Sequence, residues 1–314
     1  MREDRIRGVV AGQAAGDALG SHCEFGPPGS VARFGPGVFG HPAGCWTDDT
    51  EQLTIVLAAR SDPDAVAAGL LAWYNGHPRD VGNQTAAVLG SAGTPAGVLP
   101  AARAYAARMA AEPRPRGWDP GSGNGSLMRT SGVCLPCLGD RARIAEAARQ
   151  VSDLTHCDAH TGDACVLWSL AIDAAIAAAE PIAVTAIGEL VSGGLEFIPD
   201  GRRGYWRDAI AEALHAHPQR FRSNGGVAGA FRAALSAVAH NTTYEGVIKC
   251  AVAIGGDTDT VAAIAGGLAG ALHGASAIPA EWRARVHGWS PHGELDCAGL
   301  ERLALEAAGM PIPQ

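Results

Sequence analysis

Lysine is almost absent from this chain of 314 residues: Lys249 is the only one, and arginine supplies every other positive side chain. The formal net charge is -8 and the isoelectric point is near 5.7. No basic stripe is present that could follow a phosphate backbone, which excludes sequence-specific reading of nucleic acid. The abundance of alanine, glycine and arginine beside a single lysine points to a GC-rich bacterial genome.

Long apolar runs are also missing. The first ten residues carry charges of both signs, and acidic residues interrupt the longest apolar stretches, so we expect no signal peptide, no membrane association and a cytoplasmic protein. The eight cysteines lie mostly in apolar helical stretches, which favours reduced thiols over disulfides. A zinc site from Cys134, Cys137, His156 and His160 is the weaker alternative, because the segment between the two pairs is too long for a zinc finger.

β-branched alternating runs are scarce, whereas alanine-rich segments with helical length and period recur at 164–180, 225–240 and 260–274. Clusters of glycine and proline separate these helices. No linker, low-complexity tract or fixed repeat interrupts the chain. The sequence therefore predicts an all-α fold, with residues 1–314 forming a single compact multi-helix domain.

The first predicted helix carries an acid on its apolar side. Helical spacing places Asp17 on the same stripe as Ile6, Val10 and Ala14, so its carboxylate faces inward and needs hydrogen bonds or a cation. This helix is expected to end near Gly20, and Glu24 follows in a loop. In the last strong helix, glycines 266, 267 and 270 cost about 1 kcal/mol each relative to alanine, which predicts close packing against another backbone.

Two acidic clusters stand at predicted helix starts. The first contains Thr47, Asp48 and Asp49, and the second, in the reverse order, contains Asp257, Asp259 and Thr260. Either cluster alone is typical of a helix cap. If the two meet in the fold, however, four carboxylates converge with no adjoining lysine or arginine in either motif, which favours hard divalent cations, two Mg²⁺ or Mn²⁺ sharing these ligands. Glu51 is expected to cap the helix that follows the first cluster.

These motifs carry a family resemblance. GDALGSHCEF, WTDDTE, GNGSLMR, THCDAH and GGDTDTVAAIAGGLAGALHG occur in this order over residues 16–274, and together they resemble the ADP-ribosylglycohydrolase family, which includes dinitrogenase-reductase-activating glycohydrolases and ADP-ribosylarginine hydrolases. The resemblance implies an all-α fold with a binuclear Mg²⁺ or Mn²⁺ centre. Carried over by position, it implies six metal ligands: Thr47, Asp48, Asp49, Asp257, Asp259 and Thr260. It matches Glu24 to the family's loop glutamate near the metals.

The implied reaction is hydrolysis of the glycosidic bond between ADP-ribose and an acceptor, often an arginine guanidinium. Such cleavage passes through an oxocarbenium-like state that two carboxylates normally serve as acid and base or nucleophile. We expect Asp49, or a ligand beside it, to orient the water and Glu24 to move protons or polarise the ribose; the division between them stays open. Metal ions could replace part of the carboxylate pair by fixing the sugar.

Other loops supply candidate contacts to the substrate. The glycine-rich stretch 121–126 could form a nest of backbone N–H groups for the diphosphate. The residues expected to bind the substrate are Asp80, Gly82, Asn83, Gly123, Asn124, Gly125, Ser126 and His156. Thr155 and His156 are expected to open another helix, and a capping role for the histidine is an equal alternative. Gln84 and Gly132 depart from the family's usual residues, which puts the acceptor in doubt.

The sequence thus predicts a monomeric metal-dependent hydrolase that removes ADP-ribose from a protein or small molecule, with arginine as the expected linkage. Two alternatives are a catalytically silent ADP-ribose-binding regulator and a hydrolase of O-linked ADP-ribose or other nucleotide conjugates. A silent regulator would be expected to have lost a ligand or Glu24, and all seven positions are present.

Overall fold

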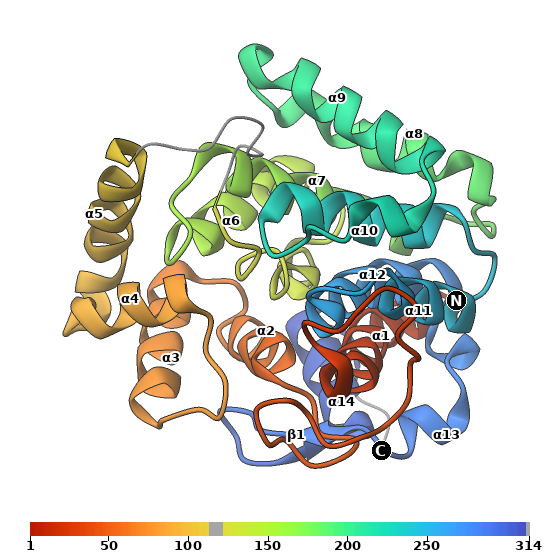
Figure 1. Ribbon diagram of the computed structural model, residues 1–314, viewed down its shortest axis with the longest axis horizontal. Helices are drawn as coiled ribbons and strands as arrows, with labels where there is room; N and C mark the ends of the chain where they lie inside the picture. The colour runs from red at the N-terminus through yellow and green to blue at the C-terminus, as the bar shows by residue number, and fades with distance from the viewer. Residues whose placement is uncertain (113–121, 312–314) are drawn as a thin grey trace.

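A computed structural model describes residues 1–112 and 122–311, and these residues are mostly helical (Figure 1). The α-helices are α1 (Arg2–Gly20), α2 (Asp48–Ala58), α3 (Pro63–Asn75), α4 (Asn83–Ala92), α5 (Val98–Ala111), α6 (Arg141–Asp153), α7 (Ala159–Ala177), α8 (Ile187–Ser192), α9 (Asp200–His215), α10 (Val227–Ala239), α11 (Tyr244–Ile254), α12 (Thr258–His273), α13 (Ala280–Arg283) and α14 (Cys297–Ala307). The expectation of a helical fold is confirmed.

Short elements connect these helices. Within the described ranges the only sheet is an antiparallel pair of two-residue strands, β1 (His287–Gly288) and β2 (Leu295–Asp296). The single-turn 3-10 helices are η1 (Ser21–Cys23), η2 (Pro95–Gly97), η3 (Thr130–Gly132), η4 (Leu135–Cys137), η5 (Val184–Ala186), η6 (Gly193–Phe197), η7 (Pro218–Phe221) and η8 (Ala275–Ala277). All eight cysteines are free, as expected.

The centre of the molecule is the pair α1 and α12, with α11 and α14 packed against it (Figure 1). The pair is antiparallel and has almost no side chains at its contact line. A Cβ atom at Gly12 would lie against the carbonyl oxygen of Gly266, and one at Gly8 against that of Gly270. The close backbone packing predicted from the glycines is therefore confirmed, and its partner is the first helix.

This packing places the end of α1 beside the start of α12. The Thr258 hydroxyl donates to the Gly20 carbonyl over 2.9 Å. Just beyond, the Phe25 N–H donates to the Gly256 carbonyl over 2.6 Å and the Gly256 N–H donates to that of Gly26 over 3.0 Å. Gly256 has a φ of 76° and no room for a side chain beside Asn224. The loop that carries Glu24 is thus tied to the turn that precedes α12.

One helix start differs from the prediction. Thr155 and His156 lie in the turn after α6 and do not open a helix. The N-cap of α7 is Asp158, whose carboxylate accepts from the N–H groups of His160 and Thr161 over 3.0 and 3.1 Å. Aspartate accepts from two free N–H groups here, whereas the histidine is turned toward the protein interior.

None of the helices in the described part of the chain is long and apolar enough to span a bilayer.

Candidate active site

The first turns of α2 and α12 meet at a cavity of about 450 Å³. Asp48 and Asp49 reach it from α2, and Asp257, Asp259 and Thr260 reach it from the start of α12. Glu24 joins them from the loop that follows η1. The structure therefore brings together the two acidic clusters that lie about two hundred residues apart in sequence, and each helix directs the positive end of its dipole toward them.

Asp17, on α1, holds the first cluster in place through hydrogen bonds. Its carboxylate accepts from the N–H and hydroxyl of Thr47, each over 2.9 Å, and from the N–H and hydroxyl of Thr50 over 3.1 and 2.7 Å. The hydroxyl of Thr47 also lies 3.2 Å from a carboxylate oxygen of Asp49. Of the two alternatives for Asp17, hydrogen bonds or a cation, the structure shows the hydrogen bonds. Through them Asp17, which belongs to α1, satisfies N–H groups at the start of α2.

Glu51 does not cap α2, which corrects the expectation. It lies one turn inside the helix and accepts from the indole N–H of Trp73 over 2.6 Å. The physical reason is that Asp17 already satisfies N–H groups at the helix start, which leaves Glu51 free to point elsewhere.

The second cluster is held by amides. Asp257 is the N-cap of α12; its N–H donates to the Asn224 side chain over 2.9 Å, and its carboxylate accepts from the Asn124 amide over 2.6 Å. Asp259 accepts from the N–H of Thr260 over 2.9 Å. Asn124, predicted as a substrate contact, thus both lines the cavity and fixes one acid of the cluster.

Two groups of these acids are close enough to share a cation. One oxygen each from Asp17, Asp49 and Asp259 lie within 4.8 Å of one another, and so do oxygens of Glu24, Asp257 and Asp259. Asp259 belongs to both groups. Among the described residues these are the only such groups, so the alternative zinc site at Cys134, Cys137, His156 and His160 is not assembled.

Burial and mutual repulsion raise the pKa values of these acids. Burial, reinforced by the charges of Asp257 and Asp80, raises the pKa of Glu24 to about 8. Burial and neighbouring carboxylates raise the pKa values of Asp48, Asp49 and Asp259 well above the ordinary range. Such shifts mean that the acids cannot all ionise together without a compensating positive charge.

The nearest buried cation reaches the cluster only through an amide. Arg129, fully buried, donates to the Gln52 side-chain oxygen over 2.8 Å, and the Gln52 amide donates to Asp48 over 3.3 Å. No ion pair among the described residues links an arginine or lysine to Asp48, Asp49, Asp257 or Asp259. Arg129 therefore orients the amide without neutralising the acids.

The same arginine fixes the proton on His156. Arg129 donates to the Thr155 hydroxyl over 2.7 Å, and that hydroxyl lies 2.8 Å from Nδ1 of His156. Because the hydroxyl accepts from the arginine, its own proton is directed to Nδ1, which leaves the imidazole proton on Nε2. Burial and the Arg129 charge lower the pKa of His156 well below its ordinary value, so the ring presents a neutral N–H donor at the cavity wall.

Most of the predicted substrate contacts line this cavity. The structure places Asp80, Gly82, Asn83, Gly123, Asn124, Gly125 and His156 on its wall. Gly121, the first residue of the predicted glycine-rich nest, lies outside the described residues. Gln84 also lines the cavity, where its amide donates to the Thr155 carbonyl over 3.0 Å and its oxygen accepts from the Gly123 N–H over 3.4 Å.

Ser126 and Gly132 do not reach the cavity. The Ser126 hydroxyl lies 2.9 Å from that of Ser152, in the interior. Gly132 lies in η3, where a Cβ atom would meet Leu53 and Leu57. The Ser126 hydroxyl is thus turned away from the cavity and Gly132 lies in the core, and the expectations that Ser126 contacts the substrate and that Gly132 bears on the acceptor stay predictions.

Sequence reasoning missed the aromatic residues of the wall. Phe25, Phe39 and Tyr105 line the cavity, and the two phenylalanine rings meet edge to face with centroids 6.4 Å apart. They are 67% and 44% exposed, although large apolar side chains normally lie inside. The sequence did contain a signal. A phenylalanine stands on each side of a glycine- and proline-rich loop, and neither belongs to a helix or strand pattern that would bury it in the core.

Comparisons with known proteins match the chain over nearly its whole length. A family model for ADP-ribosylglycohydrolase matches residues 1–311. The chain is 30% identical over 314 residues to the ADP-ribosylarginine hydrolase Tri1 of Pseudomonas putida, covering 92% of this chain and 76% of that protein. It is 26% identical to the ADP-ribosyl-[dinitrogen reductase] glycohydrolase of Rhodospirillum rubrum, covering 90% of each. A solved structure titled ADP-ribosylglycohydrolase-related protein complex aligns over 99% of both chains, with 27% identity and a TM-score of 0.77. The chain belongs to the ADP-ribosylglycohydrolase family.

Proposed function

We propose that this protein is a metal-dependent hydrolase that releases ADP-ribose from an acceptor, and that the acceptor is an arginine guanidinium. The observation that carries the proposal is the convergence of Glu24, Asp48, Asp49, Asp257 and Asp259 at one cavity without a basic side chain to pair them. Two of the similar proteins are named as hydrolases of ADP-ribosylarginine and of ADP-ribosyl-dinitrogen reductase, which supports the same substrate class here.

The donor set fits hard divalent cations. Carboxylate oxygens and threonine hydroxyls suit Mg²⁺ or Mn²⁺, and the raised pKa values record the charge that such ions would compensate. We assign Thr47, Asp48, Asp49, Asp257, Asp259 and Thr260 as the residues that would hold two ions. Bound there, the ions would supply positive charge that orients the ribose and activates water.

The other residues of the cavity are assigned by what they offer. The backbone N–H groups of Asn124 and Gly125 and the Nε2–H of His156 supply neutral donors suited to the oxygens of a diphosphate or ribose, and Gly123 lines the same wall with its N–H directed to Gln84. Asp80, Gly82 and Asn83 form the wall on the side of α4. We place the two phosphates and their sugars along this wall, with the reacting ribose at the acids.

Hydrolysis then requires one proton to be removed and one delivered. A water oxygen adds to the anomeric carbon of the ribose while the bond from that carbon to the acceptor nitrogen breaks, and the departing nitrogen takes a proton. We assign Asp49 to orient the water and Glu24 to move the proton. The products are ADP-ribose and the free guanidinium.

The test measures release of ADP-ribose from arginine-linked and serine-linked substrates with Mg²⁺, with Mn²⁺ and with EDTA. We expect metal-dependent release from arginine that Glu24→Ala abolishes. Glu245→Ala is the matched control, because it removes the same side chain at the surface, where Glu245 pairs with Lys249. Release from serine alone would replace the arginine assignment, and saturable ADP-ribose binding without release from either would favour a silent regulator.

A further inference from the structure

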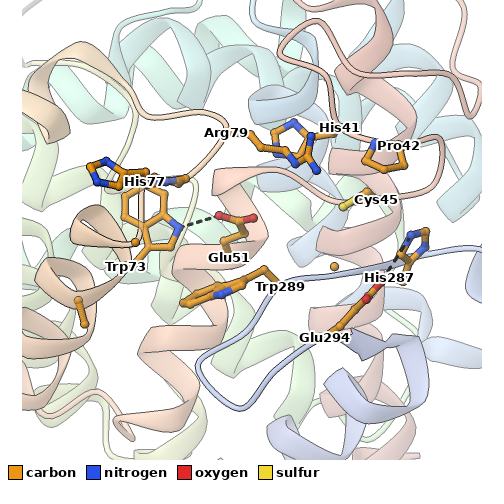
Figure 2. A pocket seen from close by; sticks show the side chains of 14 residues that line it. His41, Pro42, Cys45, Glu51, Trp73, His77, Arg79, His287, Trp289 and Glu294 are labelled. Carbon is orange, nitrogen blue, oxygen red and sulfur yellow. Dashed lines mark hydrogen bonds and ion pairs between the residues drawn. The ribbon is translucent and has the colours of Figure 1, made fainter.

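A second cavity, of about 430 Å³, lies beside α2 and shares no lining residue with the first. Figure 2 shows the Glu51 carboxylate pointing into it, with the rings of Trp73 and Trp289 beside the carboxylate and His41 and Arg79 on the other side. None of these five residues has a role in the proposed hydrolysis. The cavity therefore needs its own explanation.

Glu51 is a buried carboxylate with an incomplete set of partners. It is 7% exposed, and its carboxylate accepts a hydrogen bond from the indole N–H of Trp73 over 2.6 Å. None of the ion pairs formed by the described residues includes it. Arg79 lines the same cavity, but its guanidinium donates to the Gly40 carbonyl over 3.0 Å. The cavity's own arginine is thus held at the rim.

Asp163 shows how the same chain completes such a site. This buried carboxylate also accepts from an indole N–H, that of Trp206 at 3.2 Å, and in addition it pairs with Arg202 at 2.6 Å and Arg149 at 2.7 Å. Glu51 has an indole N–H as a partner but no guanidinium. A buried charge without a partner is costly, so the missing partner is expected to be a cation that enters from outside.

His41 gives a second, independent sign of a ligand. It is only 2% exposed, yet neither of its ring nitrogens has a hydrogen-bond partner within the described structure. It lines the same cavity as Glu51. Buried polar atoms are normally satisfied, so His41 marks a place in this wall where the protein's own hydrogen bonding is incomplete.

The walls select the kind of cation. A guanidinium is planar, stacks on indole faces and pairs with carboxylates, whereas an ammonium is a compact, strongly hydrated charge. Trp289, 37% exposed, supplies an indole face, and Glu51, held by the N–H of the buried Trp73, supplies the carboxylate. We propose that this second cavity is a binding site for a guanidinium group, carried either by free arginine or by an arginine residue of a polypeptide. The site is separate from the hydrolase cavity and does not depend on the proposed function.

Calorimetry with the full-length protein tests the site. The probes are L-arginine, Nα-acetyl-L-arginine N-methylamide and the matching neutral citrulline derivatives. We expect saturable binding of an arginine probe and binding of its citrulline counterpart that is weaker by about tenfold or more, since the ureido side chain of citrulline has no charge. Tighter binding of free arginine would identify the free amino acid as the ligand, and equal or tighter binding of the blocked form would identify a polypeptide residue. Equal binding of arginine and citrulline, or no saturation up to about 10 mM, would overturn the proposal.

Substitutions in the two cavities show where the arginine probe binds. Glu51→Gln keeps an oxygen for the Trp73 hydrogen bond but removes the charge, and we expect it to weaken the arginine probe by about tenfold or more. Trp289→Leu, on an exposed segment, should weaken it as well. Glu245→Gln is the control, because it removes the same charge from a surface position that lines neither cavity. Asp259→Asn separates the two cavities: if it abolishes arginine binding while Glu51→Gln does not, the ligand occupies the acidic cluster and the second site is wrong.

Discussion

Two sets of buried carboxylates in this protein differ in whether arginine side chains pair with them. Asp163 on α7 pairs with Arg149 and Arg202, and Glu301 on α14 pairs with Arg7 and Arg283. Asp48, Asp49 and Asp259, at the starts of α2 and α12, are buried as well, but no ion pair among the described residues includes them. The chain has twenty-four basic residues, so a shortage of arginine is not the reason.

The difference separates structural acids from the chemical acids, by which we mean those at the cavity to which we assign the metal ions and the reaction. An arginine neutralises a buried carboxylate permanently and occupies its oxygens. At the cavity, hydroxyls and amides such as those of Thr47, Gln52 and Asn124 orient the carboxylates and leave their net charge uncompensated. This arrangement keeps the oxygens available for a cation that is not part of the chain.

The largest expected effect comes from removing a chemical acid. Asp48→Ala and Asp259→Ala should each lower metal-dependent ADP-ribose release by about a thousandfold or more, because a lost metal ligand removes several kcal/mol of transition-state stabilisation. Their helical content should be that of the wild type, since no basic side chain is left buried and unpaired. Steady-state kinetics and circular dichroism check both points. Full activity in both variants would show that the acids serve only as helix caps.

Removing a structural acid should lower the stability of the protein and leave its activity unchanged. Asp163→Ala leaves Arg149, Arg202 and the Trp206 indole without their shared partner, which should lower the free energy of unfolding by about 3 kcal/mol. Activity per folded molecule should be retained, because Asp163 does not line the cavity. Urea unfolding together with kinetics at low temperature measures the two quantities. A loss of activity with unchanged stability would break the distinction between the two sets.

The cation should stabilise the folded protein by binding to the acids of the cavity and not to the structural acids. With free Mn²⁺ or Mg²⁺ at about one hundred times its dissociation constant, the wild type should gain about 2.7 kcal/mol against unfolding through mass action. Asp257→Asn should lose most of this gain, whereas the structural variant Asp163→Ala should keep it. Thermal unfolding in metal and in EDTA gives the comparison. An equal gain in the Asp257 variant would mean that the metal binds elsewhere.

Much of this organisation was predictable from local patterns. The inward-facing Asp17, the end of the first helix at Gly20 and the close packing of the glycines in α12 all follow from helical spacing and the cost of glycine in helices. The meeting of the two acidic clusters was predictable only as a hypothesis, because it depends on the antiparallel contact of α1 and α12. That contact is itself built from glycines, which carry no sign of their partner.

Sequence reasoning could not predict the direction in which each side chain points. Glu51 and Asp49 lie two residues apart on one helix, yet one points to Trp73 and the other to the acids of α12. Ser126 belongs to the loop that lines the cavity, but its hydroxyl is turned into the core. The capping of α2 by Asp17 joins residues thirty apart, so no local rule finds it. The single-domain and monomer expectations stay predictions.

The smallest expected effect concerns His156, where a neutral donor is kept beside a buried arginine. Because its pKa is lowered in the folded state, the folded protein binds fewer protons at this position than the unfolded chain does, so this contribution to stability is present above the ordinary value of 6.5 and is lost as the pH falls below it. In wild type the loss should approach about 1.4 kcal/mol per pH unit, and His156→Gln should lack it. The stability difference between wild type and the variant should therefore narrow from pH 7.5 to pH 5.5, as urea unfolding at each pH can measure. A difference that stays constant would mean that the imidazole gains a proton without cost, in which case the hydrogen bond from Thr155 does not fix its tautomer and the cavity wall does not hold a neutral donor.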